Sequence, residues 1–269
     1  MLTIFSIPKP FAGATGELQV AAVASWARLG PDNQIVLVGE APAAGRNLSF
    51  EQVETLQPEG SSAPLLDDAF ARVETLARQP LRCFVNADIV LLPDLLPAVE
   101  ACGTAFPRFL LVGQTRDLDP ALVRGAGPEE LRGVALERGV LRGPTAIDWF
   151  VFPAGLFDPM PPFSVGRAAF DNWMIWKARQ VGPVIDATEA VVTVHQAHGY
   201  GHLAGGKDEA YYGAEAARNL ELAGGTSRRY TLHDASHLMR ADLSIRRNPG
   251  SILRARETAR KIGWKLGIR

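Results

Sequence analysis

Short apolar runs alternate with an amphipathic segment over the first part of the chain. The run at 1–8 is rich in isoleucine and phenylalanine and ends in "PKPFAG", and a second run, "IVLVGE", occupies 35–40. Between them, residues 19–29 place apolar side chains at helical spacing and are followed by Gly30-Pro31. Continuous apolar runs of this length are typical of strands that are covered on both faces. The pattern therefore predicts strand, helix and strand, which is a βαβ opening.

The helical period returns after residue 64, where Leu66, Phe70 and Val73 share one stripe. Two aspartates occupy the first turn, where the helix dipole stabilises negative charge. Elsewhere the pattern predicts a short element within 50–56, strands at 81–85, 109–113 and 147–153, a short helix near Glu129 in a polar excursion over 117–145, a helix at 168–182, and a strand "AVVTVH" at 190–195 that ends the sheet. This order predicts one α/β domain over 1–240, a Rossmann-like mixed sheet flanked by helices.

The last part of the chain, 241–269, is expected to be a basic helical appendage. Residues 246–269 hold eight basic side chains against the single acid Glu257, and their apolar residues are spaced as one helical face. Such a helix can lie on an anionic membrane surface, or it can pack on its own domain with its charges solvated. Both interpretations stay open.

Charge and composition narrow the class of protein. The 269 residues include 28 basic and 29 acidic side chains, so no overall field attracts a nucleic acid backbone, and we expect no nucleic acid partner. Asp94 interrupts the most apolar stretch, and the N-terminus has no basic region ahead of its apolar residues. We therefore expect a cytoplasmic protein in which Cys83 and Cys102 are reduced structural thiols.

The stretch "FVNADIVL" interrupts an apolar run with an amide and a carboxylate, Asn86 and Asp88. Both follow the strand predicted at 81–85, and ligands of open α/β sheets bind at the carboxyl ends of strands. Oxygen ligands on such a rigid platform suit a divalent metal that bridges phosphates. The alternative is that the two side chains only cap the turn that follows.

The order of these features resembles that of the GT-A-fold glycosyltransferases, in particular a family 2-like group of the bacterial surface-polysaccharide type. The resemblance rests on the βαβ opening, on Asn86-Ala87-Asp88, and on "PFSVGRAAFDNW", "VIDATEAVVTVHQAHGYGH" and "EAARNLELAGG". It implies a nucleotide-sugar donor, a saccharide or lipid-linked acceptor, and a divalent cation, Mn²⁺ or Mg²⁺. In that family the strand usually ends in an Asp-x-Asp motif that holds the metal against the donor diphosphate. Asn86 stands where the first Asp would be and offers a neutral ligand, so Asp88 is the principal candidate.

The resemblance also implies a catalytic carboxylate near the start of a late helix, where it would deprotonate the acceptor hydroxyl. Asp171 of "FDNW" matches that position, and at a helix start we expect its pKa to be lowered. The alternative is a carboxylate that only stabilises the helix dipole. Asp148, which opens "DWFVFP", is the second catalytic candidate. Trp149 and Trp173 could stack on a sugar, although core positions are commoner for such residues.

The stretch "HQAHGYGH" gathers three of the five histidines within eight residues. Imidazoles bind metals or the charge that develops on a diphosphate leaving group. The resemblance implies that a late histidine completes the metal site, and His195 and His198 fit that place. The alternative is a loop with one histidine in the core and the others solvated. A zinc hydrolase site is disfavoured because the helical His-Glu-x-x-His pattern is missing.

Donor contacts are expected near the ends of the first two strands, at Pro8 and Glu40, and from Lys207, which follows a glycine pair and could reach phosphate oxygens. Two other functions stay open. A nucleotidyltransferase would share the nucleotide-binding half, but "IPKPFAGATGE" supplies only Lys9 of the expected basic signature. A non-catalytic relative that binds glycans or a partner is compatible with Asn86 in place of a carboxylate.

Overall fold

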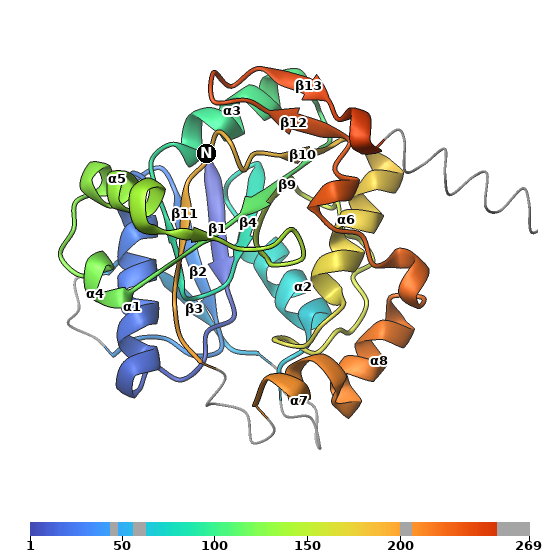
Figure 1. Ribbon diagram of the computed structural model, residues 1–269. Helices are drawn as coiled ribbons and strands as arrows, with labels where there is room; N and C mark the ends of the chain where they lie inside the picture. Colours follow the sequence, from blue (N-terminus) through green and yellow to red (C-terminus); the bar gives the residue numbers. More distant parts are fainter. Residues whose placement is uncertain (44–47, 56–62, 200–205, 252–269) are drawn as a thin grey trace, which may run out of the picture.

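The computed structural model describes residues 1–43, 48–55, 63–199 and 206–251 (Figure 1). Its largest feature is a nine-stranded mixed sheet. In spatial order, the strands are β13 (Ile245–Arg247), β12 (His237–Met239), β10 (Val184–Asp186), β6 (Leu110–Gln114), β9 (Ile147–Pro153), β4 (Leu81–Val85), β1 (Leu2–Ser6), β2 (Gln34–Val38) and β3 (Glu51–Val53). Strand β9 is antiparallel to both of its neighbours, and β13 is antiparallel to β12; all other pairs are parallel. The predicted α/β class with a mixed sheet is confirmed.

A second, four-stranded sheet has the order β5 (Ile89–Leu91), β11 (Thr193–Gln196), β7 (Arg116–Leu118) and β8 (Val140–Leu141). The helices are α1 (Gly13–Ala27), α2 (Leu66–Leu76), α3 (Leu95–Ala105), α4 (Pro120–Val123), α5 (Pro128–Arg138), α6 (Phe170–Val181), α7 (Gly206–Tyr212) and α8 (Ala214–Leu222), with short 3₁₀ turns η1 (Thr226–Arg228) and η2 (Leu232–Asp234).

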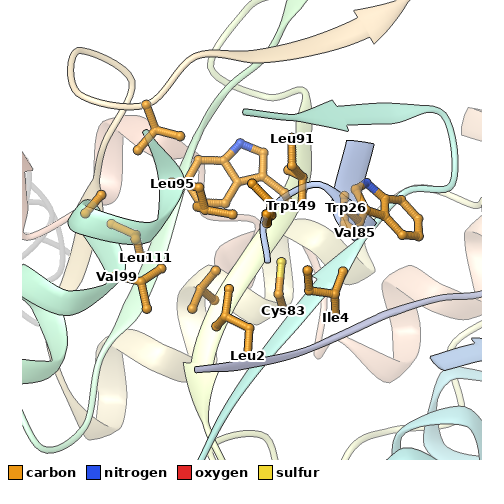
Figure 2. Packing of buried hydrophobic residues seen from close by; sticks show 14 of the residues in the cluster. Leu2, Ile4, Trp26, Cys83, Val85, Leu91, Leu95, Val99, Leu111 and Trp149 are labelled. Atoms are coloured by element: carbon orange, nitrogen blue, oxygen red, sulfur yellow. The ribbon is translucent and has the colours of Figure 1, made fainter. Parts of the chain in front are cut away.

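Helices cover both faces of the large sheet because successive strand residues point to opposite sides. Ile4 of β1 and Cys83 of β4 contribute to the core under α1 and α3, and Figure 2 shows these two side chains beside Leu2. Phe5 and Phe84, one residue further along, belong to the core under α2 and α6, where their rings stack 5.2 Å apart. Strands buried on both faces explain why the sequence shows continuous apolar runs rather than alternation.

The strand at 190–195 was expected to end the main sheet, and that prediction was wrong. β11 instead lies in the small sheet, between β5 and β7. The main sheet continues through β10, β12 and β13, each of which has three residues and therefore gives little periodic signal. Helices α4 and α5 cover the small sheet, where Leu118 and Leu131 lie in a third apolar cluster.

Helix α1 begins six residues before the predicted start at 19. Gly16 permits the early start, because a Cβ at this position would lie 2.5 Å from the carbonyl carbon of Phe11. The first turns of the helix therefore pack directly on the loop that follows β1. Both Cys83 and Cys102 are buried free thiols, as expected, and burial raises the pKa of each, to about 12 for Cys102.

The main sheet crosses the domain boundary expected at residue 240, because β13 is hydrogen-bonded to β12. Arg246 and Arg247 lie in this strand rather than in a helix, and the rest of the predicted basic helix, 252–269, falls outside the described residues. Over the part of the chain that the structure covers, none of the helices combines the length and apolar character that crossing a bilayer requires.

Candidate functional site

Two strand ends place Lys9 and Asp88 near each other. β1 and β4 are parallel neighbours with Phe5 opposite Phe84, and each of the two charged residues comes four positions after its phenylalanine. Burial lowers the pKa of the Lys9 ammonium, while the Asp88 carboxylate opposes that shift. A cation and an anion therefore share the carboxyl edge of the central parallel strands, the expected edge for ligands.

The small sheet brings His195 to the same edge. β5 starts directly after Asp88 and pairs with β11 so that Ile89 lies opposite His195. The Nε2 atom of His195 is 3.8 Å from Oδ2 of Asp88, and Nε2 of His198 is 2.7 Å from the same oxygen. The two imidazole rings lie 5.2 Å apart. The pairing of β5 with β11 thus brings together the residues predicted to bind a metal, over a separation of more than a hundred positions.

The three side chains fit a divalent cation. One potential ligand atom from each of Asp88, His195 and His198 lies within 4.8 Å of the other two. Oδ1 of Asp88 is buried and has no hydrogen-bond partner among the residues that the structure describes. A buried carboxylate oxygen without a partner is costly, and a cation would satisfy it. A donor set of one carboxylate and two imidazoles suits a transition metal better than Mg²⁺.

His198 makes the shortest contact with the Asp88 carboxylate in this cluster. One ring nitrogen faces the Asp88 carboxylate and the other lies 2.8 Å from the carbonyl oxygen of Gly199, so both nitrogens face acceptors. These two contacts, led by that with Asp88, raise the pKa of His198 against the effect of burial. Burial would raise the pKa of Asp88, but the hydrogen bond from His198 and the nearby His195 and Lys9 lower it overall.

Asn86 points away from this cluster. Its side-chain Nδ2 donates to Oδ1 of Asp148 over 3.0 Å, and its backbone amide donates to the carbonyl of the same residue. Oδ2 of Asp148 accepts from Thr115 at 2.9 Å and forms an ion pair with Nη1 of Arg142 at 2.6 Å. The Asp148 carboxylate is therefore occupied on both oxygens, which is the environment of an anchoring group.

Asp171 lies in the first turn of α6, and its pKa is raised to about 6, not lowered as predicted. Burial is the main cause, the charge of Asp148 adds to it, and the amide of Asn172 and the guanidinium of Arg229 oppose it. Oδ1 of Asp171 is buried without a partner among the described residues. A carboxylate with such a pKa is suited to accept a proton near neutral pH.

The residue before α6 has an unusual backbone. Ala169 has φ +89°, a left-handed conformation that non-glycine residues seldom adopt. Its neighbour Ala168 donates a backbone hydrogen bond to Ala210 of α7, and Arg167 is buried and paired with Glu215 of α8 at 2.8 Å. Strained residues cluster at functional sites, and this segment leads directly into Asp171.

The remaining predicted residues are more scattered. Pro8 is buried beside Lys9, whereas Glu40 is exposed after the Gly39 turn. Lys207 is exposed on α7 with its Nζ 5.8 Å from the ring centre of Tyr211. Trp149 and Trp173 are core residues. Tyr200 and His202 fall outside the described residues.

Four polar residues around the site were not singled out for it from the sequence: Lys9, Asp117, Arg142 and Arg167. Lys9 could have been found, because it follows an adjacent strand by the same offset as Asp88. Asp117 and Arg142 could not, since their positions depend on the pairing of β7 with β8 and β11.

Comparisons with known proteins found similarity to solved structures only. No family model matches the sequence. No curated protein matches it either. Among solved structures, a mannosyltransferase from Pyrobaculum calidifontis in complex with GDP-Man and Mn²⁺ is 17% identical with a TM-score of 0.42, over 72% of this chain and 56% of that one.

Two further solved structures resemble the chain. TarS 1–349 of S. aureus in complex with UDP is 11% identical, with a TM-score of 0.48 over 82% of this chain and 64% of that one. Glucosyl-3-phosphoglycerate synthase of M. tuberculosis is 15% identical, with a TM-score of 0.48 over 94% and 92%. This chain spans less than two thirds of the mannosyltransferase and TarS chains. The structural neighbours are GT-A-fold glycosyltransferases, the group that the order of motifs in the sequence resembles.

Proposed function

We propose that this chain is a glycosyltransferase that moves a sugar from a nucleotide-diphosphate donor to a hydroxyl acceptor. One observation carries the proposal: Asp88, with its unpartnered buried oxygen, faces two histidines and lies near Lys9 at the carboxyl edge of the parallel strands. A cation held by Asp88, His195 and His198 would neutralise charge on a diphosphate. Lys9 adds a second positive group on the same side.

Asp171 is the proposed general base. The acceptor hydroxyl loses its proton to the Asp171 carboxylate as the acceptor oxygen forms a bond with the anomeric carbon. The bond between that carbon and the diphosphate oxygen breaks, and the nucleoside diphosphate leaves with the electron pair. The pKa of about 6 keeps Asp171 mostly ionised at neutral pH yet basic enough to take the proton.

The donor contacts beyond the diphosphate are also part of the proposal. Pro8 and Glu40 come two residues after the ends of β1 and β2 and would approach the nucleoside, and Lys207 would approach the phosphates. The acceptor is a saccharide or a lipid-linked hydroxyl compound. Contact of the basic segment 246–269 with an anionic membrane would bring a lipid-linked acceptor to the enzyme, and binding to vesicles with and without anionic lipid would test it.

Donor binding is the direct test. Thermal unfolding is measured with GDP- and UDP-sugars, each with and without Mn²⁺ or Mg²⁺, because a ligand that binds only the folded state raises the melting temperature. We expect a metal-dependent rise with at least one donor, and slow hydrolysis of that donor. Both should be lost in Asp88→Ala and retained in Asp32→Ala, which removes an exposed acid just before the amino end of β2, the end opposite to the site. Absence of any shift across the donor series would reject the proposal.

Asn86 favours one other candidate, a non-catalytic relative that binds a donor or glycan without transferring it. Such a protein would show the thermal shift in the same experiment, but Asp171→Asn would leave every measured property except stability unchanged. Release of nucleoside diphosphate from a bound donor, lost in Asp171→Asn, distinguishes the enzyme from the binding protein.

A further inference from the structure

Asp117 lies behind His195 on the side away from Asp88. β7 and β11 are parallel with Asp117 directly opposite His195, and Oδ1 of Asp117 is 2.6 Å from Nδ1 of the imidazole. A carboxylate can only accept a hydrogen bond, so Nδ1 carries the proton in this contact. In the neutral ring the other nitrogen, Nε2, is then the one with the free lone pair, and it faces Asp88.

Asp117 is itself held in place. Nε of Arg142 lies 3.5 Å from Oδ1 of Asp117, and Nη1 of the same guanidinium pairs with Asp148. The backbone fixes Arg142, since its amide donates to the carbonyl of Thr115 at 2.9 Å and its carbonyl accepts from the side chain of Gln114. The Arg142 guanidinium therefore bridges two carboxylates from a backbone that is itself hydrogen-bonded.

These contacts form a closed ring. From Asp88 the ring passes through His195, Asp117 and Arg142 to Asp148 and its partner Asn86, and the backbone of Ala87 closes it. Each side chain in this ring of contacts is linked to the one before it and to the one after it. The side-chain amide of Asn86 is thus not a weakened metal ligand. It is a hydrogen-bond donor to the Asp148 carboxylate.

We propose that Asp117 is a positioning residue that fixes His195 in the tautomer with an unprotonated Nε2 directed at Asp88, and that Arg142 keeps Asp117 in place. The inference rests on the proposed function, because it assigns His195 as a ligand of the divalent cation. It also explains how the site holds a cation with one strand-end carboxylate: the Asp117 carboxylate orients the imidazole so that its second nitrogen serves as a ligand. Without Asp117, the imidazole of His195 could carry its proton on Nε2, and this N–H would face Asp88 and obstruct the cation.

The tautomer is measured first, on the protein without metal. ¹⁵N spectra of the imidazole at pH 8, with the His195 signals assigned by loss in His195→Gln, report which ring nitrogen carries the proton. We expect Nδ1–H in the unchanged protein and a shift toward Nε2–H in Asp117→Ala. Asp117 is 42% exposed, so its truncation leaves no large cavity. Nε2–H in the unchanged protein, or identical spectra in the variant, would overturn the inference.

Mn²⁺ alone is the second probe, with affinity measured by calorimetry. Loss of such an orienting partner typically weakens metal binding by about 10- to 100-fold, and we expect this for Asp117→Ala, with Asp117→Asn in between because the amide oxygen can still accept from Nδ1. The matched control is Asp119→Asn, which removes the same charge two residues away while asparagine keeps the cap on Ala121.

The outcomes separate the two proposals. If the unchanged protein binds no Mn²⁺, the metal part of the proposed function fails, and the tautomer spectra still decide the role of Asp117. If Mn²⁺ binds and the Asp117 and Asp119 variants weaken it equally, the effect is one of general charge, and the positioning role is wrong.

Discussion

The side-chain amide of Asn86 donates to the Asp148 carboxylate, with Nδ2 3.0 Å from Oδ1. This contact explains why an amide follows β4 at the position where an Asp-x-Asp motif would have its first carboxylate. Asp148 is only 10% exposed at its side chain, and a second carboxylate in place of the amide would face it without a proton between them. The identity of residue 86 is therefore set by Asp148, which comes 62 positions later in the chain.

Asn86→Asp tests this relationship, since it recreates the Asp-x-Asp motif. We expect a loss of about 1–3 kcal/mol in the free energy of unfolding at pH 7, the usual cost of an unsatisfied buried group, and no gain in Mn²⁺ affinity. The loss should shrink toward pH 4, where a shared proton restores a hydrogen bond between the two carboxyls. Urea denaturation at both pH values measures it. Asn86→Ala isolates the missing donor from the added charge, and a variant as stable as the parent with tighter Mn²⁺ binding would contradict the explanation.

Much of the fold could be predicted from local patterns. The strands β1, β2, β4, β6 and β9 are continuous apolar runs because they are covered on both faces, so each is visible in the sequence alone. The three-residue strands β10, β12 and β13 were missed because their place in the sheet depends on pairing partners far along the chain. These three strands are also shorter than the five that the sequence shows, so the length of a strand, more than its composition, decides whether it can be predicted.

The same division applies to the site. Asp88 and His198 follow strands and His195 lies in one, and their residue types alone indicate metal chemistry, so sequence patterns found them. Nothing in the local sequence distinguishes Asp117 from other acidic residues, because only the register of β7 and β11 places it behind His195. The pKa of Asp171 was predicted in the wrong direction because a helix dipole contributes about 0.3–1 kcal/mol at a surface, less than the cost of burying this carboxylate.

Asp171→Asn should stabilise the protein while abolishing transfer. The pKa of Asp171 is raised to about 6 by burial, so the folded state binds the proton more tightly than the unfolded state. The ionised carboxylate therefore destabilises the fold, and stability attributable to this group falls as pH rises from about 4 to 6. The variant should exceed the parent by about 2–3 kcal/mol above pH 7 and converge with it near pH 4.

Urea denaturation at pH 4, 6 and 8 follows this difference, and transfer rates over the same range should rise through pH 6 as the base ionises. Asp67→Asn, in the first turn of α2, is the control, because it also removes a carboxylate from a helix start. A constant difference between parent and Asp171→Asn at all three pH values would show that Asp171 does not titrate as described.

Lys9→Gln should weaken binding of nucleoside diphosphates but not of nucleosides. Burial leaves the Lys9 ammonium poorly solvated, and an anionic ligand would replace the missing water. Loss of one charge-assisted hydrogen bond corresponds to about 1.5–3 kcal/mol, or roughly 10- to 150-fold in affinity. Calorimetry with a diphosphate and the matching nucleoside measures both, and equal weakening of the two ligands would place Lys9 outside the phosphate site.

Gly16→Ala should disturb the site from the opposite side of the loop that carries Lys9. A Cβ at position 16 would lie 2.5 Å from the carbonyl carbon of Phe11 and 2.8 Å from its oxygen, so backbone must move. We expect a loss of about 1–3 kcal/mol in unfolding free energy from this overpacking, together with weaker diphosphate binding. Gly103→Ala in α3 is the matched control, because its Cβ would meet open space and alanine favours helix by about 0.5–1 kcal/mol. Equal stability changes in the two variants would show that the contact between α1 and the loop does not constrain the chain.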